Sequence, residues 1–420
     1  MFASLLLQGS ALLFGFISSW YIARHLGAAQ YGAYAYVFQW AVVLGGLVAA
    51  SYDKLLVRYI ALYSEQPKGG AYQKGLLYGV VAMGTVGSSM AILFCLFLAQ
   101  HEAWLPTLRS CAIAAIGLTA LTAACQAYLS GRGYTVAARV PELLLRPGLL
   151  CAGLGLSLLL RANTDLTASK LAWLNIAAMT LACLAALGYA AYHARGQWHG
   201  QVAFAWDDWL PDMRWFAWSG AAALLQARSD VLLLGWILPE TSIDLGIYLV
   251  ALRLSDLAKT PLIALNMTIA PQIAILHAQG NTIALQQLVS RQGRKAWLLS
   301  TCIIVGLLGF GKIMLPYWGN DFEAAYLPLC WLCAGQWINV ACGPAGNLLN
   351  MTGHAAVAFR SLLMTMVVGI VAQIVGICWW GATGAAAATA LSMLVWNSLM
   401  TWQCRQKTGI RAAVWQSGVR

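Results

Sequence analysis

The feature that most constrains this chain is a succession of long apolar runs with few charged side chains in them. An α-helix needs about 20 apolar residues to cross the hydrocarbon core of a bilayer, and each run has that length. Strands of a membrane barrel would instead alternate in segments of about ten residues. Twelve spanning helices are predicted, at about 3–23, 33–51, 76–98, 109–129, 141–160, 171–192, 215–237, 246–268, 296–315, 326–348, 356–379 and 383–402.

The composition predicts the same fold class. Apolar residues make up 60% of the 420 positions and charged residues only 9%, whereas about a quarter of a soluble domain is charged. Most of the 11 cysteines lie inside apolar runs, where they behave as small hydrophobic residues. We therefore expect an all-α integral membrane protein.

Lysine and arginine predict the orientation. They concentrate in the connections and flanks that lie on the N-terminal side of the membrane, for example Lys54, Arg58, Arg139 and Arg291. The positive-inside rule then places both termini in the cytoplasm. No cleavable signal precedes the first run. Because Met1 enters that run almost directly, a few native residues are expected upstream of it. The formal charge of +11 reflects this topology and attraction to anionic membrane lipid, and it does not indicate nucleic-acid binding.

The chain repeats itself at about half its length. Gly32-Ala-Tyr34 matches Gly246-Ile-Tyr248, and the segment Leu129 to Ala137 matches Leu349 to Val357. Two pseudo-symmetric six-helix bundles are predicted, an N-terminal lobe at 1–212 and a C-terminal lobe at 213–420. Because six is even, both bundles enter the membrane from the same side, as in transporters built from parallel repeats.

One predicted span carries three charges, Arg253, Asp256 and Lys259. Each ionised group near the bilayer centre costs about 2.5–3.5 kcal/mol on insertion scales, so the three oppose insertion by roughly 8–10 kcal/mol if unpaired. At about 100° per residue they occupy one face of a helix, which must then face protein or water. Two interpretations stay open: a salt-bridge network that fixes helix packing, or a site for a charged substrate.

Three segments resemble a known family. Trp20 to Tyr34 looks like the first-to-second span signature of Wzx-type polysaccharide-export flippases of the multidrug/oligosaccharidyl-lipid/polysaccharide (MOP) superfamily. The segment from Ala227 to Leu254 resembles the seventh-to-eighth span signature of that family. Ala270-Pro-Gln-Ile273 is similar to the end of its eighth span. An insertion, Ser242-Ile-Asp244, and a short N-terminus depart from the family pattern.

The resemblance implies a flippase, not an enzyme. Its substrate would be an undecaprenyl-diphosphate-linked oligosaccharide, moved from the cytoplasmic to the periplasmic leaflet of a bacterial inner membrane for a surface polysaccharide such as the O-antigen of lipopolysaccharide. It implies two lobes around a cationic central cavity, in which Arg24 and Arg253 match cavity arginines of related lipid II flippases. A polysaccharide polymerase or other assembly proteins are the expected partners, a monomer is the default state, and no cofactor or metal is expected.

The charged residues within spans have two interpretations each. Four of them are cations that could replace the hydration of a diphosphate: Arg24, Arg228, Arg253 and Lys259. We favour this role for Arg253 and leave both roles open for Arg24. For Arg228 and Lys259 we favour a structural role.

Asp230 and Asp256 could couple transport to protons or sodium, or could neutralise nearby cations. For Asp256 we favour charge pairing, because it is three residues from both Arg253 and Lys259. Glu142 and Arg146 follow Pro141 at spacing four, which favours a salt bridge at a helix start over a site.

Two other functions compete with the flippase. A multidrug extruder of the same superfamily moves organic cations and would need an acidic cavity, whereas these spans carry cations. A polyprenol-dependent membrane glycosyltransferase, polymerase or ligase would need a larger outer loop than the sequence provides. Sugar composition, polymer type and coupling ion are not predicted by the sequence.

Overall fold

The computed structural model describes residues 2–64, 69–101, 104–159, 167–195, 201–239 and 242–416. The chain packs as two compact units. The N-terminal unit comprises Phe2–Leu26 and Ala33–Arg228, and the C-terminal unit comprises Gly27–Gly32 and Ser229–Arg420. The short segment Gly27–Gly32 of the first helix thus belongs to the C-terminal unit. The predicted lobe boundary at 212/213 stays a prediction.

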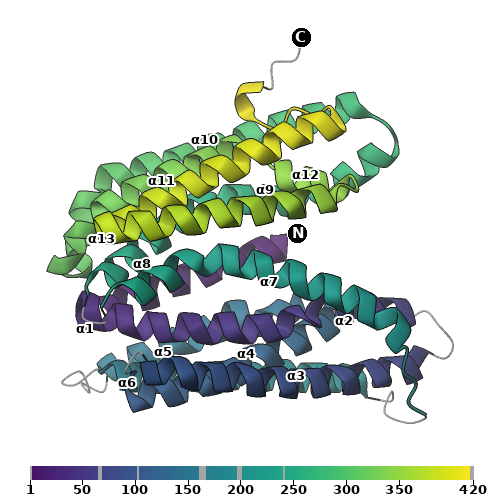
Figure 1. Ribbon diagram of the computed structural model, residues 1–420, viewed down its shortest axis with the longest axis horizontal. Coiled ribbons are helices and arrows are strands. Elements are labelled where there is room, and N and C mark those ends of the chain that lie inside the picture. The colour runs from purple at the N-terminus through teal and green to yellow at the C-terminus, as the bar shows by residue number, and fades with distance from the viewer. Residues whose placement is uncertain are drawn as a thin grey trace. The chain divides into compact units, whose positions relative to one another are not determined.

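In the N-terminal unit the helices run alongside one another (Figure 1). Its elements are α1 (Phe2–Ala50), α2 (Asp53–Ser64), α3 (Gly69–His101), α4 (Pro106–Gly131), the short turns η1 (Ala137–Arg139) and η2 (Pro141–Leu145), α5 (Arg146–Leu159), α6 (Ala168–Ala194) and most of α7 (Trp206–Ile237). Helix α4 is central to the packing, because α2, α3 and α6 all contact it.

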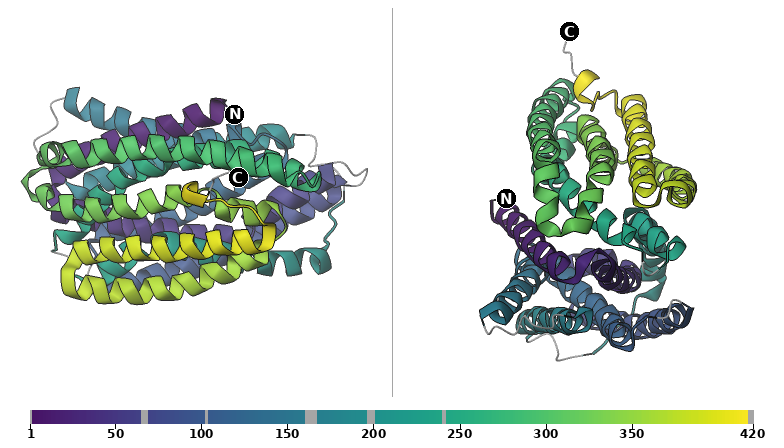
Figure 2. Two further views of the ribbon diagram at one scale, coloured as in Figure 1. Left: turned by 90° about the horizontal axis from the view of Figure 1, so that it is seen from above. Right: turned by 90° about the vertical axis from the view of Figure 1, so that its left-hand side faces the viewer.

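The C-terminal unit is likewise a set of helices, seen partly end-on in Figure 2. Its elements are α8 (Asp244–Ser255), η4 (Asp256–Lys259), α9 (Thr260–Ala278), α10 (Thr282–Met314), η5 (Leu315–Trp318), η6 (Asn320–Ala325), α11 (Tyr326–Ala341), α12 (Ala345–Met351), α13 (Ala355–Thr408) and η7 (Val414–Gln416). Helix α13 contacts α8, α11 and α12, and α9 packs on α10.

The apolar runs do form long helices. Seven helical stretches in the described residues are long and apolar enough to cross a membrane, which confirms an all-α membrane protein. Some stretches hold more than one predicted span: α1 holds the first two, on either side of Gly27, and α13 the last two, on either side of Gly381. Both glycines have positive φ, at 73° and 54°, a backbone conformation that glycine adopts without steric cost. The exact number of twelve spans stays a prediction.

The predicted regular helix at 246–268 is wrong in one respect. Helix α8 ends at Ser255, a 3₁₀ turn follows in η4, and α9 begins at Thr260 with Pro261 in its first turn. Proline lacks the N–H that a helix interior needs, so it favours a new helix start at this point. The three charged residues therefore lie at a junction between helices and not on one uniform helix face.

The second sequence repeat is a shared helix ending. Helix α4 is followed by Gly133 at φ 91°, and α12 is followed by Gly353 at φ 81°. In each half the next residue donates a backbone hydrogen bond five positions back: Tyr134 to Leu129 at 2.9 Å, and His354 to Leu349 at 2.8 Å. Glycine in the left-handed region with this six-to-one hydrogen bond is the Schellman motif. The repeat therefore encodes the same C-terminal cap twice.

The first sequence repeat is a close helix crossing within the C-terminal unit. A Cβ atom on Gly32 would lie 2.9 Å from the backbone nitrogen of Gly246. A Cβ atom on Gly246 would lie 2.1 Å from the carbonyl oxygen of Ala28. Small residues let helix backbones approach this closely inside membranes. The matched glycines of the two halves thus lie at one crossing, between α1 and α8.

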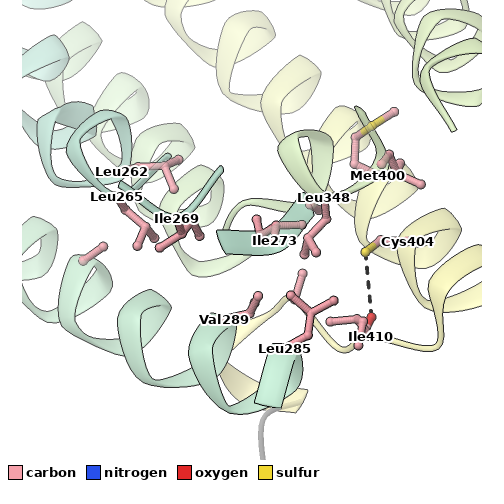
Figure 3. Close-up of a cluster of buried hydrophobic side chains, with 14 of the residues drawn as sticks. Leu262, Leu265, Ile269, Ile273, Leu285, Val289, Leu348, Met400, Cys404 and Ile410 are labelled. Carbon is pink, nitrogen blue, oxygen red and sulfur yellow. Dashed lines mark hydrogen bonds between the residues drawn. The ribbon is translucent and has the colours of Figure 1, made fainter. Parts of the chain in front are cut away.

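A buried apolar cluster holds the end of the C-terminal unit together (Figure 3). It joins Leu265 and Ile273 of α9, Val289 of α10, Leu348 of α12 and Met400 of α13. The segment after α13 also enters it through Ile410, which is 3% exposed. Backbone groups of Arg411 bond the Gln286 side chain at 2.8 and 2.9 Å. The tail is therefore fixed to α10 by both apolar and polar contacts.

Candidate functional site

The charged junction of the C-terminal unit separates its three charges. In η4, Lys259 Nζ lies 2.6 Å from Asp256 Oδ1. A 3₁₀ turn has three residues per turn, so positions three apart lie one above the other. Arg253 is exposed, one turn earlier in α8, and among the described residues it has no ion-pair partner. At this junction Asp256 therefore neutralises the charge of Lys259, and Arg253 is left as an exposed cation.

Asp230 lies in a polar cluster of the same unit. Its carboxylate accepts a hydrogen bond of 2.5 Å from the Tyr248 hydroxyl and one of 2.8 Å from the Val231 backbone N–H. The Tyr248 hydroxyl also lies 3.2 Å from Thr389 Oγ1 on α13. All three polar side chains are buried. Sequence reasoning singled out Asp230 but missed Tyr248 and Thr389, because the cluster forms only when α7, α8 and α13 pack.

Two further predicted cations belong to the N-terminal unit. Arg24 on α1 is exposed, and its guanidinium lies 5.6 Å from the ring centre of Trp20, one turn earlier. Such a cation–π contact holds the side chain along its own helix. Arg228 is exposed near the end of α7 and is the last residue of this unit. Each of these two arginine side chains is thus exposed on the surface of its own helix.

The N-terminal unit contains a small pocket that sequence reasoning did not predict. Its volume is about 70 Å³, and it is lined by Thr119 and Gln126 of α4, Glu142 of η2 and Arg146 of α5, among others. Gln126 Nε2 donates a 2.8 Å hydrogen bond to Glu142 Oε2. Element η2 is a π-helix, a rare geometry that often occurs at functional sites.

Buried amides support the arginine of this pocket. An Arg146 guanidinium nitrogen lies 3.5 Å from Asn175 Oδ1, and Asn175 in turn donates to the Tyr34 hydroxyl at 2.9 Å. Asn175 is 6% exposed. This chain of contacts orients Arg146. The sequence pattern of Glu142 and Arg146 signals a charged helix start, and the structure adds that both residues line a pocket.

A second pocket of the same unit has a volume of about 330 Å³ and shares the lining residues Ala123 and Gln126 with the first pocket. Its charged lining is Asp53, Lys54, Arg58 and Arg139. Arg58 is paired with Asp212 at 2.7 Å. We call the two pockets, whose linings share Gln126, the Gln126 groove.

The profile of a family described as "Polysaccharide biosynthesis protein" matches residues 1–277. This chain belongs to that family. The match covers all of the N-terminal unit and, in the C-terminal unit, includes α8, η4 and Arg253. The predicted family is therefore confirmed.

A curated relative matches part of the chain. The probable low-salt glycan biosynthesis flippase Agl15 of Haloferax volcanii is 28% identical over 170 residues, which is 40% of this chain and 35% of that protein. The matched region thus spans about a third of the relative, so the activity of the whole relative is not transferred by this match alone.

Solved structures show the same fold over nearly the whole chain. The lipid II flippase MurJ, in an inward closed conformation, matches with a TM-score of 0.74 and 11% identity over 96% of this chain and 87% of MurJ. A multidrug resistance MATE transporter of the MOP superfamily, inward-facing, gives a TM-score of 0.72 and 11% identity over 97% and 96%. This polysaccharide biosynthesis protein thus has the fold of the MOP superfamily transporters, as predicted.

The MOP fold itself accommodates binding pockets of different polarity. A structure from Pyrococcus furiosus, described as a MOP transporter whose reversed pocket polarity suggests a different function, matches with a TM-score of 0.66 and 11% identity over 97% of this chain and 94% of that protein. The fold therefore does not determine the substrate, which has to be inferred from the charged residues of this chain.

Proposed function

We propose that this polysaccharide biosynthesis protein is a flippase that moves an undecaprenyl-diphosphate-linked oligosaccharide from the cytoplasmic to the periplasmic leaflet by alternating access. The observation that carries the proposal is Arg253, an exposed cation in a helix that the family profile covers. Because Asp256 pairs with Lys259 at 2.6 Å, the junction leaves Arg253 to bind an anion.

The chemistry of the substrate supports this role. A diphosphate loses its hydration when it leaves water, and fixed cations with several N–H donors must replace it. Arginine does this well because its planar guanidinium is always charged and bonds two phosphate oxygens at once. Arg24 and Arg228 are proposed as additional cations for the substrate, whereas Lys259 is proposed as the charge partner of Asp256. The direction follows from the side on which lipid-linked sugars are made.

Ion coupling is part of the same proposal. We propose Asp230 as the group that binds a proton or sodium ion, since its carboxylate is buried and lies against the Tyr248 hydroxyl. An acid in a low-dielectric membrane interior gains or loses its charge only with a large change in free energy, which suits a coupling group. Asp256 is proposed as a charge partner only, because Lys259 already neutralises it.

The test is a translocation assay in liposomes loaded with a fluorescent undecaprenyl-diphosphate oligosaccharide. An external quencher or lectin reports the sugar that reaches the outer leaflet. Wild type is compared with Arg253→Ala, Arg253→Lys and the control Arg291→Ala, which changes an exposed arginine of α10. We expect Arg253→Ala to lose at least about 90% of the rate, because one charge-assisted contact contributes about 1.5–3 kcal/mol, and Arg253→Lys to lose less.

Three results contradict parts of the proposal. Unchanged translocation in Arg253→Ala would leave the flippase intact but return Arg253 to a structural role. A wild type that moves no lipid-linked sugar would refute the flippase. Movement of an organic cation such as ethidium instead would establish the multidrug extruder, which shares the MATE fold.

A further inference from the structure

Helix α7 carries the chain from one unit to the other. Residues 206–228 pack within the N-terminal unit, and residues 229–237 belong to the C-terminal unit. The proposed alternating access requires one unit to move against the other, and hinge positions at the ends of elements absorb such movements. Because α7 is continuous across the boundary, it has to bend or to leave one unit during that movement. The contacts of α7 therefore indicate where the movement begins.

The chain is fixed to the N-terminal unit at the start of α7. The Ala203 N–H donates a 3.1 Å hydrogen bond to the carbonyl oxygen of Ala71 in α3. The indole N–H of Trp209, a buried residue, donates one of 2.9 Å to the hydroxyl of Tyr63 in α2. Pro211 follows inside the helix and lacks the N–H that would bond the carbonyl one turn earlier. The helix is thus anchored before Pro211 and can bend at it.

Directly after Pro211, one carboxylate ties α7 to α2. Asp212 Oδ2 lies 2.7 Å from Arg58 Nη1. The same oxygen lies 3.0 Å from the Tyr59 hydroxyl, which also lies 3.0 Å from the backbone carbonyl oxygen of Asp208. Tyr59 thus contacts residues on both sides of Pro211 and holds the helix in one conformation there. We call Arg58, Tyr59 and Asp212 the Asp212 latch.

The Asp212 latch opens more easily than the anchor before it. The side chains of Arg58 and Asp212 are 58% and 28% exposed, and an ion pair at such a surface is weak and screened by salt. Opening the latch returns both charges to water. Opening the anchor would instead leave the buried Trp209 N–H without its acceptor, which is costly. A movement of α7 therefore starts at Asp212 and leaves the anchor in place.

We propose that α7 pivots at Pro211 and that the Asp212 latch opens in every transport cycle. This inference rests on the proposed alternating access, and it adds the site at which the N-terminal unit holds and releases the connecting helix. With the latch closed, residues 206–228 stay on the N-terminal unit, as in this structure. With the latch open, only the anchored residues before Pro211 stay there.

The reaction of a thiol at position 50 measures latch opening without any transport. Ala50 is buried against Gly220 of α7, so the side chain of an Ala50→Cys variant reacts with a water-soluble maleimide only when α7 has moved away. Mass spectrometry of the purified full chain in detergent reads the labelled fraction at this position and at Cys111, a buried native cysteine of α4. Cys111 is the internal reference for a general loosening of the unit.

Three substitutions in this background test the latch. Asp212→Asn removes the ion pair and should speed labelling at position 50 about two- to fivefold, the contribution of an exposed ion pair. Tyr59→Phe removes the hydroxyl that contacts the same carboxylate, and it should also speed labelling. The control is Arg214→Gln, which changes an exposed arginine of α7 outside the latch and should match the background. Labelling at Cys111 should stay unchanged in all three.

A reversible cross-link tests whether the latch has to open for transport. A Cβ atom on Gly220 would lie 2.9 Å from the Ala50 Cβ, so Ala50→Cys/Gly220→Cys needs only a small shift to form a disulfide. The reference pair is Thr107→Cys/Ser169→Cys, which joins α4 and α6 within the N-terminal unit, where the two hydroxyls lie 2.6 Å apart.

Both pairs are compared with wild type in the liposome translocation assay. Oxidation of Ala50→Cys/Gly220→Cys should slow translocation at least about tenfold, because a blocked conformational step stops turnover. A reductant should restore the rate. Oxidation should leave the reference pair at its reduced rate, and oxidised wild type controls for the native cysteines.

The two assays separate failure of the latch from failure of the proposed function. Labelling at position 50 that is equally fast with and without Asp212→Asn refutes the latch, and so does an equal acceleration at Cys111. Translocation that continues with the Ala50→Cys/Gly220→Cys disulfide closed refutes the required opening and keeps the flippase. A wild type that moves no lipid-linked sugar refutes the proposed function, whereas the labelling rates still decide whether the Asp212 latch holds α7.

Discussion

The helix crossing at Gly246 gives the sharpest stability prediction. A Cβ atom added to Gly246 would lie 2.1 Å from the Ala28 carbonyl oxygen, 2.8 Å from its carbon and 3.0 Å from its Cα. All three are backbone atoms, so no side chain can turn away to make room. The Gly246→Ala variant must therefore separate α1 from α8 by more than 1 Å, roughly the shortfall from van der Waals contact.

The magnitude follows from two opposing terms. Overpacking costs about 1–3 kcal/mol, and an overlap with rigid backbone belongs at the upper end, about 3 kcal/mol. Replacing glycine by alanine inside a helix returns about 1 kcal/mol. The net destabilisation is about 2 kcal/mol. For a unit of 150–250 residues this lowers the melting temperature by roughly 4–8 °C.

Thermal unfolding of the purified protein in one detergent measures this change. The control is Gly306→Ala in α10 of the same unit, where an added Cβ atom meets nothing within 4 Å. That variant should melt at or slightly above the wild-type temperature, because it gains helix propensity without a clash. A Gly246→Ala protein that melts with or above Gly306→Ala would refute the close crossing.

Three further predictions use the same melting assay. Tyr248→Phe should cost about 1–3 kcal/mol, because the buried Asp230 carboxylate loses its 2.5 Å donor; an unchanged melting temperature would show that the carboxylate finds another donor. Gly353→Ala should cost about 1–2 kcal/mol, because φ is 81° there, whereas Gly353→Asn should cost less since asparagine tolerates that conformation; equal losses would argue against backbone strain. Lys259→Met should change stability by less than about 1 kcal/mol at either low or high salt, because its ion pair is partly exposed; a larger loss would show a buried network.

Much of the fold could be predicted because the membrane sets the length of each apolar run. The same reasoning found both sequence repeats, and each proved to encode a local structure that favours glycine. Gly133 and Gly353 end helices with positive φ, and Gly32 and Gly246 allow a backbone crossing. These features can be predicted from the sequence because each depends on one residue type at one position.

The break after Ser255 was not predicted because apolar content, which defines a span, does not report helix type. A regular α-helix would place Asp256 about equally near Arg253 and Lys259. The 3₁₀ turn of η4 decides between them in favour of Lys259. Helical periodicity therefore identified the three charged residues as a group but could not predict which two of them form the ion pair.

The Gln126 groove shows a different limit of sequence reasoning. Its members come from α2, α4, η1, η2, α5 and α6, and only Glu142 and Arg146 form a local pattern. That pattern predicts an ion pair on a regular helix, in which residues four apart face each other. In the structure this segment is a π-helix, and Glu142 accepts a hydrogen bond from Gln126. In each unit, charged residues thus lie where regular α-helix geometry is interrupted, at η2 in the N-terminal unit and at η4 in the C-terminal unit. At such interruptions a membrane helix can expose polar groups to a ligand without exposing them to lipid.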